Sequence, residues 1–321
     1  MIIVTGGAGF IGSNIAQELS KKNRVVICDK LNDPAKKRNI ASVKGKKLIK
    51  INEIFSFVEK NKKKISAVIH MGAISATDET NLKLLLNNNY LYSLKLFNIC
   101  NKYNIKFIYA SSAATYGNSF DHYDDENSFG NFLKLKPINY YGLSKHLFDL
   151  HILSLIKSGK KLGSNPVGLK FFNVYGPNEL HKGFMMSPIP KFLKEIQKTK
   201  KLNLFKSHDK KFADGAQSRD FIYIKDCVKV VIWLLKKRKL TGIYNVGTGK
   251  SRTFYDLAKT VFKNINLKPH INYVLTPKRI RDGYQYYTKA KMNSLRKAGY
   301  KKDFLTIEQG VKDYIENYLL K

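Results

Sequence analysis

A tyrosine and a lysine that could work together as an acid/base pair stand four residues apart in this chain. Tyr141 and Lys145 lie in a stretch that we predict to be helical, where this spacing puts both side chains on one face. A free tyrosine has a pKa of about 10, and a neighbouring ammonium group stabilises the phenolate and lowers that pKa. The pair could thus exchange a proton with an alcohol or a carbonyl, a contribution typically worth about 10²- to 10⁴-fold in rate.

A hydroxyl-rich segment about 30 residues upstream strengthens this interpretation. Support is needed because Tyr-x-x-x-Lys arises by chance in lysine-rich chains, and Tyr140 offers a second tyrosine. Residues 111–117 read Ser-Ser-Ala-Ala-Thr-Tyr-Gly and follow a predicted strand. We predict that Ser112 holds the substrate oxygen beside Tyr141, whereas Ser111 could be no more than a cap at the strand end.

Three glycines near the N-terminus have the spacing of a dinucleotide-binding turn. Gly6, Gly9 and Gly12 follow a predicted strand and open a predicted helix, which is the context that this motif requires. The first permits a sharp turn, the second lets a pyrophosphate approach the backbone, and the third lets helix and strand pack closely. The N–H groups and the positive dipole end of the helix would bind the phosphates.

The end of the second predicted strand bears on which dinucleotide is bound. Asp29 could accept hydrogen bonds from the adenosine ribose, which favours NAD. Lys30 and the basic run 36–38 follow closely and could pair with the 2′-phosphate of NADP, or could simply form a solvated basic loop. The residues alone leave NAD and NADP open.

The elements that must position these residues follow an alternating pattern. Short apolar runs alternate with helix-length amphipathic stretches, which is typical of a parallel sheet covered by helices. We predict an α/β fold with a doubly wound parallel Rossmann sheet. The predicted strands are 2–5, 24–28, 48–51, 67–70, 106–110 and 167–171, and the principal helices are 11–21, 82–103 and 141–156.

After residue 173 this rhythm breaks, and only 243–246 looks like a further strand of the sheet. We therefore expect residues 1–173, with about 225–247, to form the NAD(P)-binding Rossmann domain. Residues 174–224 and 248–321 would form a smaller, discontinuous substrate-binding lobe over the strand ends.

Composition narrows the class of protein. The 321 residues are 43% hydrophobic, but no apolar run reaches the roughly 18 residues that a membrane span needs. The first ten residues do not resemble a secretory leader, so we expect a cytoplasmic protein without a membrane partner. The three cysteines and seven histidines are scattered, which predicts neither disulfides nor a metal site.

The net charge of +34 suggests nucleic acid at first sight. The lysines, however, are spread along the whole chain with many asparagines, isoleucines and phenylalanines, as AT-rich codons would produce. We therefore expect no nucleic-acid partner, although a basic field would attract a diphosphate substrate.

Taken in order, the motifs resemble those of the extended short-chain dehydrogenase/reductases nearly from end to end. They are the glycine turn, His70-Met71-Gly72-Ala73, the Ser-Ser-Ala segment, Tyr-x-x-x-Lys and Phe172-Asn173-Val174-Tyr175-Gly176-Pro177. Within that family the chain is most similar to the ADP-heptose 6-epimerases, which supply the heptose of the lipopolysaccharide core. The most discriminating likeness is His181-Lys182-Gly183 after Tyr-Gly-Pro.

This resemblance implies a second acid/base group, because the heptose epimerases use a lysine at the position of Lys182. Such an enzyme removes hydride from the exocyclic carbinol carbon, turns the ketone within the site and returns hydride to the opposite face. Tyr141 and Lys182 would be the two opposed groups, with their order left open. Lys182 could instead bind phosphate or be a plain surface lysine.

The resemblance also implies ligand-binding residues, tightly bound NADP in preference to NAD, an ADP-sugar substrate and a homo-oligomer, expected to be a pentamer. The implied cofactor-binding residues, beyond the glycines and Lys145, are Phe10, Ile11, Asp29, Lys30, Lys36, Met71, Gly72, Ala73, Ile74, Ser75, Asn88 and Val174. The implied substrate-binding residues are Ser112, Asn173, Lys182, Phe205, Arg219 and Tyr284.

Alternatives remain on the same scaffold. Bulky residues in 183–187 and an apparent insertion at 206–217 leave the sugar open, so a UDP- or dTDP-hexose 4-epimerase or reductase is the nearest rival. Dehydratases carry Thr-Asp-Glu where this chain has Ala113-Ala114-Thr115, which disfavours elimination. A non-catalytic nucleotide- or RNA-binding protein is a rival of another class, disfavoured by the intact Ser112, Tyr141 and Lys145.

Overall fold

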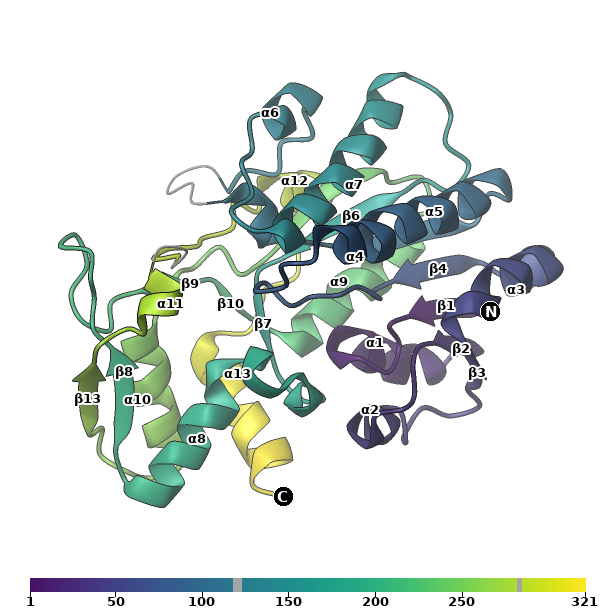
Figure 1. Ribbon diagram of the computed structural model, residues 1–321. Coiled ribbons are helices and arrows are strands. Elements are labelled where there is room, and N and C mark those ends of the chain that lie inside the picture. Colours follow the sequence, from purple (N-terminus) through teal and green to yellow (C-terminus); the bar gives the residue numbers. More distant parts are fainter. Residues whose placement is uncertain (118–122, 282–284) are drawn as a thin grey trace.

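The computed structural model describes residues 1–117, 123–281 and 285–321. At its centre lies a seven-stranded sheet with the order β3-β2-β1-β4-β5-β6-β11, in which every neighbouring pair is parallel (Figure 1). Its strands are β1 (Ile2–Thr5), β2 (Val25–Cys28), β3 (Lys47–Ile49), β4 (Ala67–His70), β5 (Lys106–Ser112), β6 (Val167–Phe171) and β11 (Gly242–Val246). The strand order reverses at β1, which confirms the predicted doubly wound sheet.

Helices cover both faces of this sheet because alternate residues of each strand point to opposite sides. Ile3 packs with one group of buried side chains from α3, α5 and α7, while Ile2 and Val4 pack with another that includes α1 and α9. These helices are α1 (Phe10–Ser20), α3 (Ile54–Asn61), α5 (Tyr92–Lys102), α7 (Tyr140–Lys157) and α9 (Ile224–Lys236), and a short α2 (Pro34–Asn39) follows β2. Among the described residues, no helix is both long and apolar enough to cross a bilayer.

The helix predicted over 82–103 is divided. It begins as α4 (Leu82–Leu85), widens into a π-helical segment at Leu86–Leu91 and continues as α5. π-Helical turns inside helices are rare and frequently stand at functional sites. The widened segment turns the Asn89 side chain into the protein.

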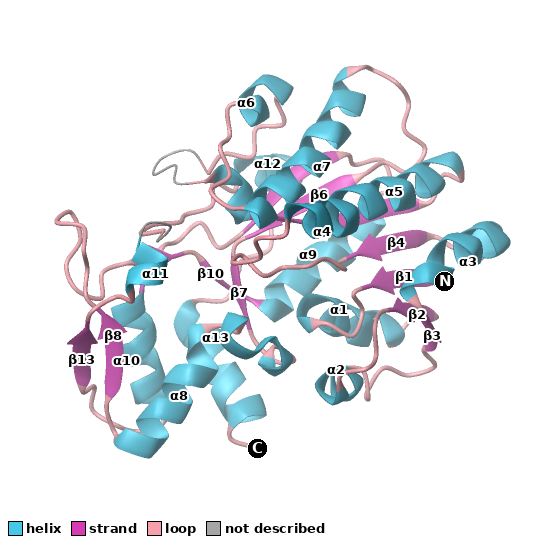
Figure 2. Ribbon diagram, in the orientation of Figure 1, coloured by secondary structure: helices cyan, strands magenta, loops and turns pink. Residues whose placement is uncertain are grey.

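The remaining chain forms small sheets and helices to one side of the large sheet (Figure 2). Sequence alone did not predict the paired strands β7 (Asn173–Tyr175) with β10 (Phe221–Tyr223), β9 (Ser218–Arg219) with β12 (Arg252–Thr253), and β8 (Leu202–Phe205) with β13 (Ile271–Val274). The helices there are α8 (Pro188–Thr199), α10 (Phe254–Asn264), α11 (Lys278–Arg281) and α13 (Ile307–Tyr314), while α6 (Phe129–Leu133) and α12 (Asn293–Lys297) lie beside β6 and β11. Residues 242–246 return to the large sheet, as predicted; the division into two lobes stays a prediction.

Candidate active site

The glycine turn joins β1 to α1 and brings the backbone close to the end of β4. Gly6 has φ 61°, and a Cβ there would stand 2.6 Å from Gly72 Cα. A Cβ on Gly12 would lie 2.2 Å from the Gly6 carbonyl oxygen, so helix and turn touch directly. The first turn of α1 carries no acidic side chain. The free N–H groups and this cradle fit a dinucleotide diphosphate.

Asp29 is bonded to the glycine turn itself. Its carboxylate accepts hydrogen bonds from the Ala8 backbone N–H at 2.9 Å and from the Lys30 N–H at 2.7 Å. It also forms an ion pair with Lys36 Nζ at 3.0 Å. The structure thus gathers three of the predicted cofactor residues, Asp29, Lys30 and Lys36, at the end of β2, beside the turn.

The segment that follows β4 is held in place by Asn89, a residue that the sequence did not indicate; the cofactor-binding role of its neighbour Asn88 stays a prediction. Asn89 is fully buried, accepts the Ile74 N–H at 2.9 Å and donates to the Ile74 carbonyl at 2.9 Å and to Ser144 Oγ at 3.0 Å. The Asn88 side chain is exposed and donates to the Leu84 carbonyl at 3.5 Å. Asn89 therefore fixes the predicted cofactor segment 71–75 against α7.

Replacing Asn89 with Ala should cost stability and weaken dinucleotide binding, whereas Asn88→Ala, on an exposed side chain, should leave stability nearly unchanged. The Asn89 variant leaves the Ile74 backbone groups without their partners, a loss of about 1–3 kcal/mol in unfolding free energy for each buried group left unsatisfied. Urea unfolding and dinucleotide affinity measure the two effects. Equal results for the two variants would contradict this role for Asn89.

Ser112 and Tyr141 are brought together at the carboxyl end of β5. An interaction with the Ser112 side chain lowers the pKa of Tyr141, against the larger, raising effect of burial. Ser112 also caps the short 3₁₀ helix Ala113–Tyr116 by accepting the Ala114 N–H at 3.1 Å. The neighbouring Tyr140 is 46% exposed. The structure therefore distinguishes the two tyrosines as the helical spacing predicts.

Ser111 is not the strand-end cap that was its alternative interpretation. Its hydroxyl donates to Asp149 Oδ2 at 2.7 Å, and the cap is Ser112. Ser111 is buried and belongs to the support beneath the site.

Lys145 lies one helical turn beyond Tyr141, with its ammonium donating to the Ala110 carbonyl at 2.9 Å. Burial lowers the pKa of Lys145 to about 8, and the Asp149 carboxylate opposes that change. The ammonium group of Lys145 therefore lies near the carboxyl end of β5, the strand that ends in Ser112.

Lys182 lies in the 3₁₀ helix Leu180–Met185, with Nζ 5.6 Å from the centroid of the Phe10 ring at the start of α1. Burial lowers the pKa of Lys182, the Glu179 carboxylate opposes this, and Lys191 adds to it. Glu179 is fully buried and accepts the Gly176 N–H at 3.2 Å and the Ser187 N–H at 2.6 Å, which closes the segment 176–187. Lys182 can therefore carry or release a proton beside the dinucleotide turn.

Three asparagines, which sequence analysis missed, tie segment 176–187 to α1 and α2. Asn14 donates to the Pro177 carbonyl at 2.9 Å, and Asn178 donates to Ser13 Oγ at 3.0 Å. Asn39 donates to the carbonyls of Ala8 and Asn178, both at 3.1 Å. The predicted division assigns Lys182 to the smaller lobe, yet its segment is bonded to the glycine turn.

Three of the predicted substrate-binding residues, Asn173, Phe205 and Arg219, each lie in a different one of the three small sheets. Asn173 begins β7 and binds the Asp220 carbonyl through its N–H at 3.1 Å, next to Arg219 on β9. Val174 follows Asn173 and is half-buried. Phe205 ends β8, where its carbonyl accepts from Gln217 at 3.3 Å. Tyr284 lies outside the described residues.

Asp220 organises the turn after β11, a role that the sequence did not indicate. Its buried carboxylate accepts the N–H groups of Thr248 at 2.7 Å, Gly249 at 2.9 Å and Ala290 at 3.0 Å. This brings residues 247–249 and 290 against β10.

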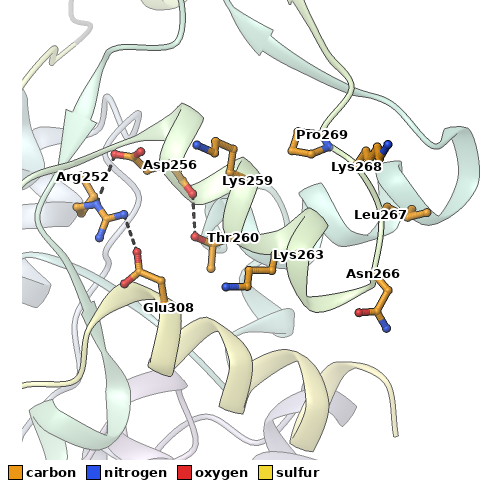
Figure 3. A pocket seen from close by; sticks show the side chains of 10 residues that line it. All are labelled: Arg252, Asp256, Lys259, Thr260, Lys263, Asn266, Leu267, Lys268, Pro269 and Glu308. Carbon is orange, nitrogen blue, oxygen red and sulfur yellow. Dashed lines mark hydrogen bonds and ion pairs between the residues drawn. The ribbon is translucent and has the colours of Figure 1, made fainter.

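A hollow of about 640 Å³ lies elsewhere, between α10 with its following loop and the start of α13 (Figure 3). Arg252 crosses its inner wall between Asp256 at 3.4 Å and Glu308 at 2.6 Å. None of the predicted site residues lines it, so we do not place the reaction there. Among the described residues, no group of three or more His, Cys, Asp and Glu side chains is arranged to hold a metal ion.

Comparison with known proteins gives a consistent result. The profile of the NAD dependent epimerase/dehydratase family matches residues 2–247. ADP-L-glycero-D-manno-heptose-6-epimerase from Fusobacterium nucleatum is 41% identical over 331 residues, covering 100% of this chain and 98% of its own length. The enzyme of the same name from Nitratidesulfovibrio vulgaris is 42% identical over 323 residues, covering 99% and 98%.

Solved structures show the same similarity in three dimensions. The Helicobacter pylori ADP-L-glycero-D-manno-heptose-6-epimerase superposes with a TM-score of 0.79 at 29% identity, covering 98% of this chain and 94% of the other. UDP-N-acetylglucosamine 4-epimerase from Methanobrevibacter ruminantium reaches a TM-score of 0.83 at 28% identity, covering 99% and 98%. The chain belongs to the NAD dependent epimerase/dehydratase family and, within it, to the ADP-L-glycero-D-manno-heptose-6-epimerases.

Proposed function

We propose that this enzyme converts ADP-D-glycero-D-manno-heptose to ADP-L-glycero-D-manno-heptose by inverting the exocyclic C6 carbon. The observation that supports the proposal most is the position of two groups that could exchange protons, one at the end of β5 and one beside the glycine turn. Tyr141, with Ser112 and Lys145, comes from β5 and α7, and Lys182 comes from the segment tied to α1. The names of the relatives that are 41% and 42% identical support the heptose as substrate.

The residues around the glycine turn fit a nicotinamide dinucleotide. Its diphosphate would be bound by Gly6, Gly9, Gly12 and the start of α1. Asp29 would accept hydrogen bonds from its adenosine ribose, and residues 71–75 would contact the part of the dinucleotide that lies beyond the diphosphate. When bound, the dinucleotide takes hydride from C6 and returns it to the opposite face, so no external reductant is consumed. Lys145 would contact the ribose and hold its ammonium near the Tyr141 phenol.

Tyr141 and Lys182 would each exchange one proton with the C6 oxygen. In the oxidation the group on one side accepts the hydroxyl proton as the carbonyl forms. After the ketone has turned within the site, the group on the other side donates a proton as the alcohol re-forms. Ser112 would hold the oxygen next to Tyr141, and Arg219 would pair with the substrate diphosphate because a guanidinium matches phosphate geometry.

We propose NADP as the resident dinucleotide. Lys30 and Lys36 stand at Asp29, and Lys36 already neutralises that carboxylate at 3.0 Å. Neutralising Asp29 lessens its repulsion of a 2′-phosphate, which the lysine then can pair with. Pentameric assembly and residence in the cytoplasm belong to the same proposal and rest on the resemblance and the sequence expectation.

Turnover of ADP-D-glycero-D-manno-heptose by the purified full chain tests the function. With NADP bound and no added reductant, we expect the L-glycero epimer to accumulate until the two epimers reach equilibrium, as followed by chromatography. A protein that binds the dinucleotide and leaves the heptose unchanged would contradict the proposal. UDP-hexoses would then test the 4-epimerase alternative, which the TM-score of 0.83 to such an enzyme favours next.

A further inference from the structure

Beneath the proposed acid/base pair lies a buried ion pair that joins three elements. Asp149 stands one helical turn beyond Lys145 on α7, and its carboxylate is 2.8 Å from Lys170 Nζ on β6. Both side chains have no exposed surface. Replacing such a pair as a whole by well-packed apolar residues is often neutral or stabilising, so stability alone does not account for its presence.

The Asp149 carboxylate also holds β5, the strand that ends in Ser112. Its Oδ1 accepts the Tyr109 hydroxyl at 3.0 Å, and its Oδ2 accepts the Ser111 hydroxyl at 2.7 Å. Lys170 donates to Thr115 Oγ1 in the short helix that Ser112 caps. The pair therefore fixes both sides of Ser112 along the chain.

The geometry also places Asp149 in electrostatic contact with the acid/base pair. Tyr141, Lys145 and Asp149 follow at four-residue intervals, so they share one side of α7. The titratable groups around the carboxylate are Tyr109 from β5, Lys170 from β6, Tyr116 from the short helix, Asp125 beyond Lys170, and His146, Tyr141 and Lys145 from α7 itself. Lys145 and Lys170 thus flank one carboxylate.

We propose that Asp149, paired with Lys170, is a positioning residue. It fixes the position of Ser112 and favours the charged, ammonium form of Lys145. Lys170 in turn limits how strongly Asp149 acts on Lys145, because it neutralises part of the same carboxylate. This role rests on the proposed function, in which Lys145 must be an ammonium ion to stabilise the Tyr141 phenolate.

Two single variants should move the titration of Lys145 in opposite directions. Burial lowers the pKa of Lys145 to about 8, and Asp149 holds it up. Asp149→Asn removes the opposite charge and should lower that pKa, since a nearby opposite charge typically shifts a pKa by roughly 1–3 units. Lys170→Met removes a like charge and should raise it.

Competitive acetylation across pH, read by mass spectrometry of the peptide that contains Lys145, measures this titration on the full chain without substrate. Asp226→Asn is the matched control, because Asp226 is an equally buried aspartate that binds Lys229 and the Leu305 N–H on the other side of the sheet. It should destabilise the fold and leave the Lys145 midpoint unchanged. Asp149→Glu keeps the charge and should keep the midpoint near that of the wild type.

The proposal is supported if the Lys145 midpoint falls in Asp149→Asn and rises in Lys170→Met. A loss of packing alone would move the midpoint in the same direction in both variants. Unmoved midpoints, or displacements in one direction, would overturn the proposal. If Asp149→Asn does not fold, the Lys145 midpoint in Lys170→Met decides the question: a rise supports the proposal, and no rise overturns it. A wild type that titrates as expected and leaves the heptose unchanged would instead contradict the proposed function.

Discussion

Tyr141→Phe should lose about 10²- to 10⁴-fold in kcat, because general acid–base help of this kind is worth that much. The Tyr141 phenol interacts with the Ser112 side chain at the end of β5. Phe keeps the ring and its packing and removes only the hydroxyl. Turnover of the ADP-heptose, measured at saturating substrate, reports the loss, and dinucleotide binding should persist.

The neighbouring tyrosine provides a matched control for this variant. Tyr140→Phe makes the same chemical change one residue earlier, on a side chain that is 46% exposed. Its turnover should equal that of the wild type. If the two variants lose activity equally, the proton passes through neither hydroxyl, and the proposed role of Tyr141 is wrong.

Lys182→Met should lose about 10²-fold or more in kcat, by the same reasoning about general acid–base catalysis. Burial lowers the pKa of Lys182 below that of an exposed lysine, so its neutral amine, which can accept a proton, is populated nearer to neutral pH. Met keeps most of the length of the side chain and cannot exchange a proton. Steady-state kcat and KM for the ADP-heptose measure the effect.

The division between kcat and KM separates the two interpretations of Lys182. An acid/base group lowers kcat with little change in KM, whereas a lysine that only binds phosphate raises KM and leaves kcat in place. Lys194→Met, on the exposed side of α8, controls for the loss of one positive charge. A raised KM with the kcat of the wild type would mean that Lys182 binds the substrate and is not an acid/base group.

Much of this architecture was predictable because it rests on local patterns. The doubly wound parallel sheet and its further strand, predicted over 243–246, follow from apolar runs and helix-length spacing, and the choice of Tyr141 over Tyr140 follows from its spacing to Lys145. The small sheets were not predicted, because strands of two to four residues are too short to show a period. Asn89 was not found because nothing in its sequence neighbourhood shows that its side chain turns inward to the Ile74 backbone.

The residues that support the site were harder to find for a different reason. Asp149, Asn39 and Glu179 act through partners that are distant in sequence or are backbone groups, and such pairings leave no fixed spacing. Asn39, for example, binds the carbonyl of Asn178, 139 residues away. Residue type indicates the chemistry of a side chain, whereas its partner is known only once the chain is folded.

The tie between segment 176–187 and the first two helices also has a mechanical consequence. Lys182 moves with α1 and α2, and Tyr141 stands on α7, which packs on the same large sheet. The spacing of the two proposed acid/base groups is thus set by the large sheet and its helices, and not by the small sheets that follow residue 187. Substitutions in α8 or α10, which carry neither group, should therefore alter the rates of substrate binding or product release without scrambling the configuration of the product.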